Sequence, residues 1–217
     1  MKPKFIIFAS GTKTGGGSGF ENLVIASRDG RLNANIVAVI SNHESGGVRQ
    51  IADKLHVPFC HFPASWTKER YQAIVDQFSA DFVALSGWLK LVSGLDPKTT
   101  FNIHPGPLPC FGGPSMYGRH VHEAVLDCYK RELIQYSAVS MHFVTEEYDE
   151  GPVFFSFPVK IIASDTAQTL GERVHDTELF FQPFISNLVV EGKIYWDGED
   201  NESLCVPSNY QYLPKLQ

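Results

Sequence analysis

Short apolar runs alternate along the chain with segments in which apolar residues recur every three to four positions. Runs of the first kind are typical of buried strands, and segments of the second kind are typical of amphipathic helices. The predicted strands cover residues 4–9, 35–41, 57–61, 81–86, 101–104, 136–144 and 153–161. The predicted helices cover residues 21–29, 68–78, 118–129 and 167–190. Pro183 should end or kink the last helix, because proline cannot donate a backbone hydrogen bond.

The order of these elements predicts an α/β fold. A strand, a helix and a strand follow one another over residues 4–41, which is the pattern of a βαβ unit with parallel strands. We expect one domain over residues 1–217, built on a doubly wound, mostly parallel twisted sheet with a Rossmann-like N-terminal half and an antiparallel C-terminal edge. Its two halves would cover about residues 1–100 and 101–195, and residues 196–217 would form a surface tail. Ligands should bind at the carboxyl ends of the strands.

Composition and charge narrow the classes of partner. Hydrophobic residues make up 43% of the 217 residues and charged residues 19%, which is enough for a buried core. The 18 basic and 24 acidic residues give a net charge of −6, so we expect no nucleic-acid partner, since nucleic-acid binding needs basic patches. A small anion can still bind through backbone N–H groups. No apolar run approaches the ~20 residues of a membrane span. The apolar run near the start, in MKPKFIIFAS, is too short for a signal peptide. We therefore expect a cytoplasmic protein without membrane contact.

Neither the cysteines nor the paired histidines predict a metal site. No two cysteines have the C-x-x-C spacing of a zinc or redox site, and they stand at Cys60, Cys110, Cys128 and Cys205. His120 and His122 would point apart on a helix, with no carboxylate or cysteine placed to complete a site. His142 is interpreted as a structural residue of its strand.

Two polar side chains mark the end of the predicted strand 101–104. Asn102 and His104 are two positions apart and therefore point to the same face, and Pro105 keeps His104 extended. Asp149 lies in an acidic turn between two later strands, and it would meet His104 if that turn folds over the strand end. A carboxylate beside an imidazole favours the charged ring and fixes its orientation. Considered singly, His104 could instead be a structural histidine satisfied by local hydrogen bonds, and the turn with Asp149 could simply be exposed to solvent.

Residues 10–19, SGTKTGGGSG, form a glycine-rich loop between the first strand and the first helix. In this context backbone N–H groups can approach a phosphate. The loop has no G-x-x-x-x-G-K-[ST] sequence and lacks a suitable third glycine for a dinucleotide fingerprint. A phosphate cradle and a flexible loop are therefore both open.

Taken together, these segments resemble one family. FNIHPGPLP at 101–109, with FGG, MYG and HVHEAV over 111–125, resembles the central signature of the glycinamide ribonucleotide formyltransferase family. SMHFVTEEYDEGP at 140–152 resembles its strand and acidic loop, LSGWLKLVS at 85–93 its folate-binding stretch, and ERVHDTE at 172–178 its substrate-contacting helix. The likeness runs from about residue 4 to residue 195 and implies the formyltransferase fold.

The resemblance implies transfer of a formyl group from 10-formyltetrahydrofolate to the amine of glycinamide ribonucleotide in purine biosynthesis, without a metal. Asn102, His104 and Asp149 would be catalytic. The folate would be bound by Asn102 and by Lys68, Trp88, Leu89, Lys90, Leu91, Val92 and Val144. The acceptor would be bound by Gly17, Ser18, Gly19, Phe20, Glu21, Asn22, Gly87, His175 and Glu178. The protein would act as a monomer or a homodimer.

The chain departs from the family pattern in three places. Its glycine loop is longer, His175 stands where glutamine is common, and Lys68 stands where arginine is common. The alternatives are a sugar-nucleotide amine formyltransferase, a formyl-folate hydrolase, a methionyl-tRNA formyltransferase and a non-catalytic folate- or nucleotide-binding module. The tRNA enzyme would need an additional basic C-terminal domain, the hydrolase an extra N-terminal domain, and the sugar enzymes tend to be longer and lack this loop.

Overall fold

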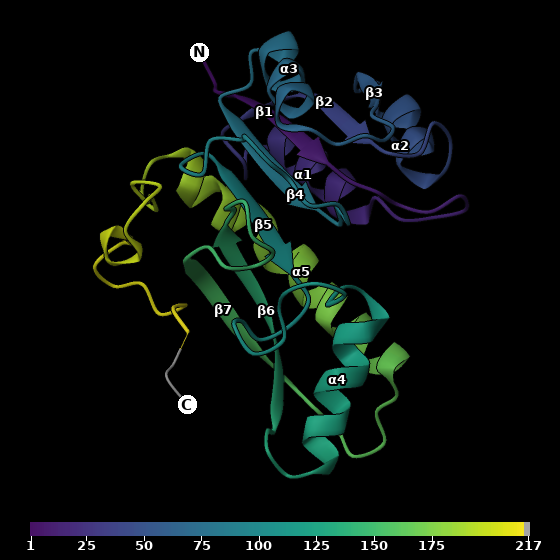
Figure 1. The fold of residues 1–217 in the computed structure, drawn as a ribbon, viewed down its shortest axis with the longest axis vertical. Coiled ribbons are helices and arrows are strands. Elements are labelled where there is room, and N and C mark those ends of the chain that lie inside the picture. The colour runs from purple at the N-terminus through teal and green to yellow at the C-terminus, as the bar shows by residue number, and fades with distance from the viewer. Residues whose placement is uncertain (215–217) are drawn as a thin grey trace.

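The structure is a computed structural model that describes residues 1–214, and a single seven-stranded sheet runs through them (Figure 1). The strands lie in the order β3-β2-β1-β4-β5-β6-β7. Their bounds are β1 Lys4–Phe8, β2 Asn35–Ser41, β3 Phe59–His61, β4 Phe82–Ser86, β5 Thr100–His104, β6 Tyr136–Phe143 and β7 Val153–Lys160. The first five strands are parallel, whereas β6 and β7 pair antiparallel at the edge. The predicted fold class is therefore confirmed.

Five α-helices lie around the described sheet. Their bounds are α1 Ser18–Asp29, α2 Gly47–Leu55, α3 Lys68–Phe78, α4 Arg119–Lys130 and α5 Ala167–Val190, and a 3-10 turn follows at Asn201–Ser203. Figure 1 shows α1, α2 and α3 at the end of the molecule that holds β1 to β4, and α4 at the other end beside β6 and β7. Among residues 1–214, no helix is both long and apolar enough to cross a lipid bilayer.

Every predicted element is present with similar bounds, but no prediction covers α2. Val48, Ile51, Ala52 and Leu55 do have the spacing of a buried helix face. The two glycines that begin the segment resemble a loop, since glycine disfavours a helix.

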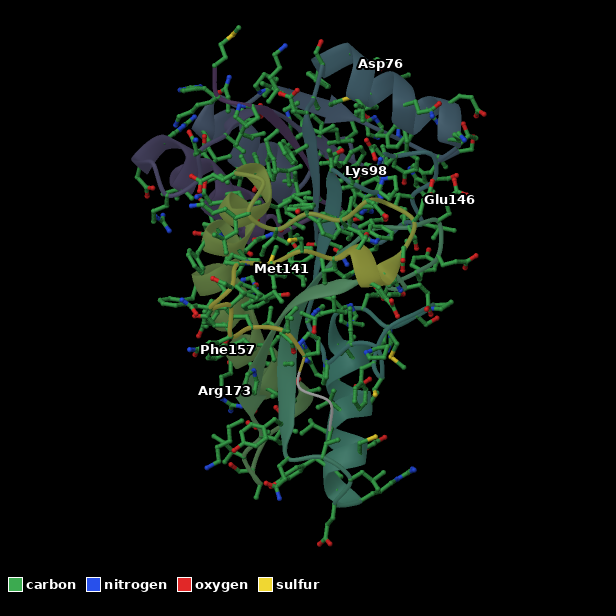
Figure 2. The ribbon with its side chains drawn as sticks, turned by 90° about the vertical axis from the view of Figure 1, so that its left-hand side faces the viewer. Asp76, Lys98, Met141, Glu146, Phe157 and Arg173 are labelled. Carbon is green, nitrogen blue, oxygen red and sulfur yellow. The ribbon has the colours of Figure 1, made fainter. Side chains whose placement is uncertain are left out.

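Apolar residues of the sheet pack on both of its faces. In β1, Phe5 and Ile7 belong to a buried cluster with residues of α1, α2, α4 and α5, whereas Ile6 and Phe8 belong to a second cluster with residues of α3. Burial on both faces explains why this strand is a continuous apolar run in the sequence. Met141 of β6 is also fully buried, and Figure 2 shows it in the interior of the molecule.

The helix α5 continues through Pro183, so of the two expected effects, an end or a kink, this residue does not produce the end. Proline cannot donate to the carbonyl four residues earlier, which here belongs to Leu179. Asn22 of α1 supplies the missing donor, because its Nδ2 donates to the Leu179 carbonyl at 2.6 Å. This bond ties the first helix to the middle of α5.

Residues 196–214 pack against the sheet, whereas the sequence predicts only a surface tail here. Trp196 is only 4% exposed, and its ring lies 5.9 Å from that of Phe143 in β6. The carbonyl of Tyr212 accepts the N–H of Ser156 in β7 at 2.6 Å, and such a contact protects a sheet edge that would otherwise be unpaired. Residues 215–217 lie outside the described part of the chain.

Candidate active site

A cavity of about 580 Å³ lies at the carboxyl ends of β1, β4 and β5. The chain leaves β1 toward β2 on one side, whereas β4 lies on the other side, and ligands bind at such a switch point in a doubly wound sheet. The cavity walls come from the end of the glycine loop, the turn after β4, the end of β5, the loop before α4 and one face of α5. Every region except the loop before α4 contributes residues that the sequence predicts.

The strand β5 presents Asn102 and His104 to this cavity. His104 is 3% exposed, and its Nε2 donates to the carbonyl of Phe111 at 2.8 Å, so the neutral ring carries its lone pair on Nδ1. Nδ1 lies 3.7 Å from Oδ2 of Asp149. Burial lowers the pKa of His104 below its ordinary value of 6.5, against the opposing effects of Asp149 and the Phe111 carbonyl. The resting imidazole is therefore neutral and can accept a proton at Nδ1.

The turn between β6 and β7 brings Asp149 over the end of β5. Asp149 has a φ of 57°, in the left-handed region that a non-glycine residue adopts only under strain. Its Oδ2 accepts the N–H of Gly113 at 2.9 Å. Burial alone would raise the pKa of Asp149, but the contact with His142, the charges that the His104 and His142 rings carry when they are protonated, and the Gly113 N–H together lower it. A charged carboxylate therefore faces a neutral His104.

His142 joins the same cluster, which goes beyond the structural role that the sequence suggested. Its Nδ1 donates to the Phe143 carbonyl at 2.7 Å, so Nε2 of the neutral ring accepts a hydrogen from Nδ2 of Asn102 at 3.1 Å. The same Nε2 lies 3.2 Å from Oδ1 of Asp149 and would donate to it if the ring gained a proton. His142 is opposite Asn102 in the pairing of β6 with β5 and is buried like its neighbours Met141 and Phe143, so burial along the strand gives no signal for it.

At the other end of the cavity, Ser18 begins α1 and faces α5. The Ser18 hydroxyl lies 3.0 Å from Nε2 of His175, whose Nδ1 lies 3.2 Å from Oε2 of Glu178. The hydrogen bond with Glu178 raises the pKa of His175 above 6.5, although partial burial opposes this rise. Ser18, His175 and Glu178 therefore form one hydrogen-bonded chain at the mouth of the glycine loop.

The remaining predicted acceptor residues divide into two groups. Gly17, Gly19 and Gly87 line the cavity. Phe20, Glu21 and Asn22 do not lie among its lining residues. The Phe20 side chain is fully buried in the core, Glu21 pairs with Lys54 at 3.0 Å, and Asn22 is engaged by Leu179. Their side chains are thus committed to folding contacts.

The predicted folate residues follow β4. The indole N–H of Trp88 donates to the Tyr71 hydroxyl at 3.0 Å, and that hydroxyl donates to the Leu91 carbonyl at 3.0 Å. Burial raises the pKa of Tyr71 to about 12, so the hydroxyl keeps its proton. This buried tyrosine anchors the turn from α3, a role with no signal in the sequence.

Residues of this turn face the acidic loop across a slot of about 50 Å³. Its walls include Trp88, Lys90, Leu91, Val92 and Val144, with Asn102 and Asp149 at its base. Asn102 and Asp149 also line the main cavity, so the two spaces meet at β5. Leu89 lines the main cavity but not the slot.

Lys68 lines neither the main cavity nor the slot. It lines a separate groove that it shares with Val92, Val144 and Glu146. Figure 2 shows Glu146 at the edge of the molecule.

Several cavity residues were not predicted, among them Ser86, His122, Tyr148 and Gln182. Gln182 lies in the middle of a long helix, where its sequence neighbours give no sign that it is buried. Among residues 1–214, no group of three or more histidine, cysteine, aspartate or glutamate side chains could hold a metal ion.

The chain was compared with known proteins. A sequence model of the formyl transferase family, described as "Formyl transferase", matches residues 3–183. The chain is 32% identical over 206 residues to "Phosphoribosylglycinamide formyltransferase, chloroplastic" of Arabidopsis thaliana, with 90% of this chain and 68% of that protein covered. It is 27% identical over 192 residues to phosphoribosylglycinamide formyltransferase of Bacillus subtilis strain 168, with 84% and 92% covered.

A solved structure shares the fold. The crystal structure of glycinamide ribonucleotide transformylase 1 from Symbiobacterium toebii superposes with a TM-score of 0.80. The superposition covers 94% of this chain and 93% of that one, at 23% sequence identity. At this identity the likeness concerns the arrangement of the chain.

Proposed function

The chain belongs to the formyl transferase family, and we propose that it transfers the formyl group of 10-formyltetrahydrofolate to the amine of glycinamide ribonucleotide. The products are formylglycinamide ribonucleotide and tetrahydrofolate, in a step of purine biosynthesis. The observation that carries the proposal is the cluster of Asn102, His104 and Asp149 between an acceptor-sized cavity and the turn after β4. We propose a cytoplasmic enzyme, a monomer or a homodimer, whose partners are these small molecules and not nucleic acids.

The chemistry proposed for the cluster is direct transfer. When the acceptor amine attacks the formyl carbon, negative charge develops on the formyl oxygen, and Asn102 donates an amide hydrogen to that oxygen. The amide has two hydrogens, and only the one held by His142 at 3.1 Å is firmly engaged, since the contact with Asp149 is 3.5 Å long. One preorganised donor of this kind contributes about 10²–10³ in rate.

His104 takes up the proton that the amine loses and returns it to the folate nitrogen as the bond between that nitrogen and the formyl carbon breaks, which releases tetrahydrofolate. Its neutral Nδ1 has a free lone pair, and Asp149 at 3.7 Å stabilises the imidazolium that then forms. The other oxygen of Asp149, Oδ1, lies 3.2 Å from Nε2 of His142, so this second imidazole also contacts the carboxylate that stabilises the charge. General acid–base help of this kind contributes roughly 10²–10⁴ in rate.

The acceptor phosphate is proposed to lie at the N-terminus of α1. Gly17, Ser18 and Gly19 present backbone N–H groups there, and a helix N-terminus favours an anion. His175 lies one hydrogen bond from Ser18 and Glu178 a second one further, and both suit the ribose end of the same ligand.

The folate is proposed to bind against the turn after β4. Trp88, Leu91, Val92 and Val144 supply apolar walls for a flat ring, and Asn102 lies at the base of the slot. The slot of about 50 Å³ is too small for a pterin, so the turn and the acidic loop must separate to admit one. The folate supplies the formyl group, and no other resident group is required.

An absorbance assay for tetrahydrofolate tests the proposal. Glycinamide ribonucleotide should be a good acceptor and glycinamide riboside a very poor one, because each charge-assisted hydrogen bond to phosphate is worth about 1.5–3 kcal/mol. A riboside that reacts as well as the ribotide, or a sugar nucleotide that reacts better, would refute the acceptor. The absence of turnover with any amine would indicate a binding module.

A further inference from the structure

A buried polar pair forms part of the cavity wall between the glycine loop and the catalytic strand. Gln182 of α5 is 1% exposed and Ser86, the last residue of β4, is 8% exposed. Nε2 of Gln182 donates to the Ser86 hydroxyl at 3.1 Å, and both residues line the cavity. Burying a carboxamide is unfavourable unless it is paired, and two apolar side chains could fill the same space without that penalty. The pair therefore requires a reason beyond the packing of α5 on β4.

The pair lies directly beneath the first turn of α1. A Cβ atom added at Gly19 would stand 2.2 Å from the Ser86 hydroxyl and 3.1 Å from Oε1 of Gln182. A side chain at this position would displace the Ser86 hydroxyl from where it lies. The hydroxyl is thus in van der Waals range of the backbone at which the acceptor phosphate is proposed to bind.

Ser86 also adjoins the catalytic strand. In the parallel pairing of β4 with β5, Ser86 is opposite Ile103, the residue between Asn102 and His104. Neighbouring strands are about 4.8 Å apart. An acceptor that reaches from the glycine loop to Asn102 must therefore pass over the end of β4, where Ser86 stands.

The hydrogen bonds at Ser86 leave its proton available. A hydroxyl has one donor and two acceptor positions, and Gln182 occupies one of the acceptor positions. Among residues 1–214, no other hydrogen bond of this hydroxyl is found. A hydroxyl that accepts a hydrogen bond is polarised as a donor.

We propose that the Ser86 hydroxyl donates a hydrogen bond to an oxygen of the acceptor, in the portion that joins its phosphate to its amine, and that Gln182 positions Ser86 for this contact. The inference rests on the proposed function and adds an acceptor-binding residue to it. The oxygen belongs to the ribose or to the glycinamide carbonyl. Ser86 would thus help distinguish a phosphoribosyl amine from amines that lack an oxygen at this point.

Steady-state kinetics of Ser86→Ala, Gln182→Leu and the double variant test this proposal. Ser86→Ala should raise the KM for glycinamide ribonucleotide about 3- to 10-fold, the value of one neutral hydrogen bond, and leave the folate KM and kcat nearly unchanged. Gln182→Leu should act in the same direction, and the double variant should be no worse than the worse single variant, because the two residues act as a unit. Gln168→Leu, exposed on the same helix and bonded to Glu172, is the matched control and should behave as the wild type.

The wild-type enzyme separates this inference from the proposed function. If the wild type does not formylate glycinamide ribonucleotide, the proposed function fails. If it does, an unchanged acceptor KM in Ser86→Ala overturns the present inference alone. An equal rise in both KM values, or fully additive single variants, would overturn it too, since either result indicates a structural role.

Discussion

The cavity contains two histidine–carboxylate pairs that are chemically alike and lie in different surroundings. The side chains of His104 and Asp149 are 4% and 11% exposed, whereas those of His175 and Glu178 are 43% and 17% exposed. Burial lowers the pKa of His104, and the hydrogen bond with Glu178 raises the pKa of His175. The buried pair is therefore suited to accept a proton during the reaction, and the outer pair is suited to carry positive charge toward an anionic acceptor.

The difference shows that surroundings decide the role of a residue type. A short carboxylate–imidazole distance alone would assign the stronger coupling to the outer pair, at 3.2 Å against 3.7 Å. Desolvation reverses that order for proton transfer, because burial favours the neutral form of His104, whereas the hydrogen bond with Glu178 favours the charged form of the half-exposed His175. The following changes separate the two pairs.

Removing the inner imidazole should have the largest effect. His104→Ala should lower kcat by roughly 10²–10⁴, because the proton acceptor is lost, and should change the folate KM little. Combining it with Asp149→Asn should add much less than the product of the single effects. Full additivity in kcat would mean that the two residues do not act as a pair.

Blocking the glycine loop should have the next largest effect, and it should fall on binding. Gly19→Val places a side chain against Ser86 and displaces the backbone N–H groups, so the acceptor KM should rise on the order of 100-fold. Gly15→Ala adds a methyl group that meets only the Thr12 hydroxyl at 3.8 Å, and it should cost far less. Similar KM values for the two variants would contradict the phosphate cradle.

Neutralising the outer pair should have a smaller effect that depends on pH. The pKa of His175 is raised above 6.5, so its charge persists to a higher pH than that of an ordinary histidine and is lost as pH increases through that raised value. The acceptor KM should then increase roughly 2- to 5-fold in the wild type, since a half-exposed charge is screened. His175→Gln keeps a hydrogen-bonding group without the charge, and its acceptor KM should not vary over this range. A wild-type KM that is independent of pH would contradict the assigned charge.

The smallest expected effect concerns the inner pair and the pH dependence of the free energy of unfolding. The folded pKa of His104 is lowered below 6.5, so its contribution to stability is present above 6.5 and is lost as pH falls toward the folded value. Urea unfolding should therefore give a lower free energy of unfolding at pH 5 than at pH 7, and His104→Gln should reduce this difference. An undiminished difference in the variant would assign the acid sensitivity to other groups.

Much of the fold could be predicted from the sequence because the strands are continuous apolar runs with polar ends. The same logic placed Asn102 and His104 on one face, and the turn that carries Asp149 does close over them. His142 and Gln182 could not be recognised in the same way. Each has a partner distant in sequence, Asn102 on the neighbouring strand for His142 and Ser86 in the same cavity wall for Gln182. The commitment of Asn22 to Leu179 likewise follows from Pro183, 161 positions away along the chain.

Single-turnover formyl transfer at saturating concentrations of both substrates tests the central assignment most directly. Asp149→Asn and Glu178→Gln make the same isosteric change, carboxylate to carboxamide, in the two pairs. Asp149→Asn should slow the transfer step by roughly 10²–10³, whereas Glu178→Gln should transfer at nearly the wild-type rate once the acceptor is saturating. Equal slowing in both variants, or a normal rate in Asp149→Asn, would contradict the assignment of the chemistry to the buried pair.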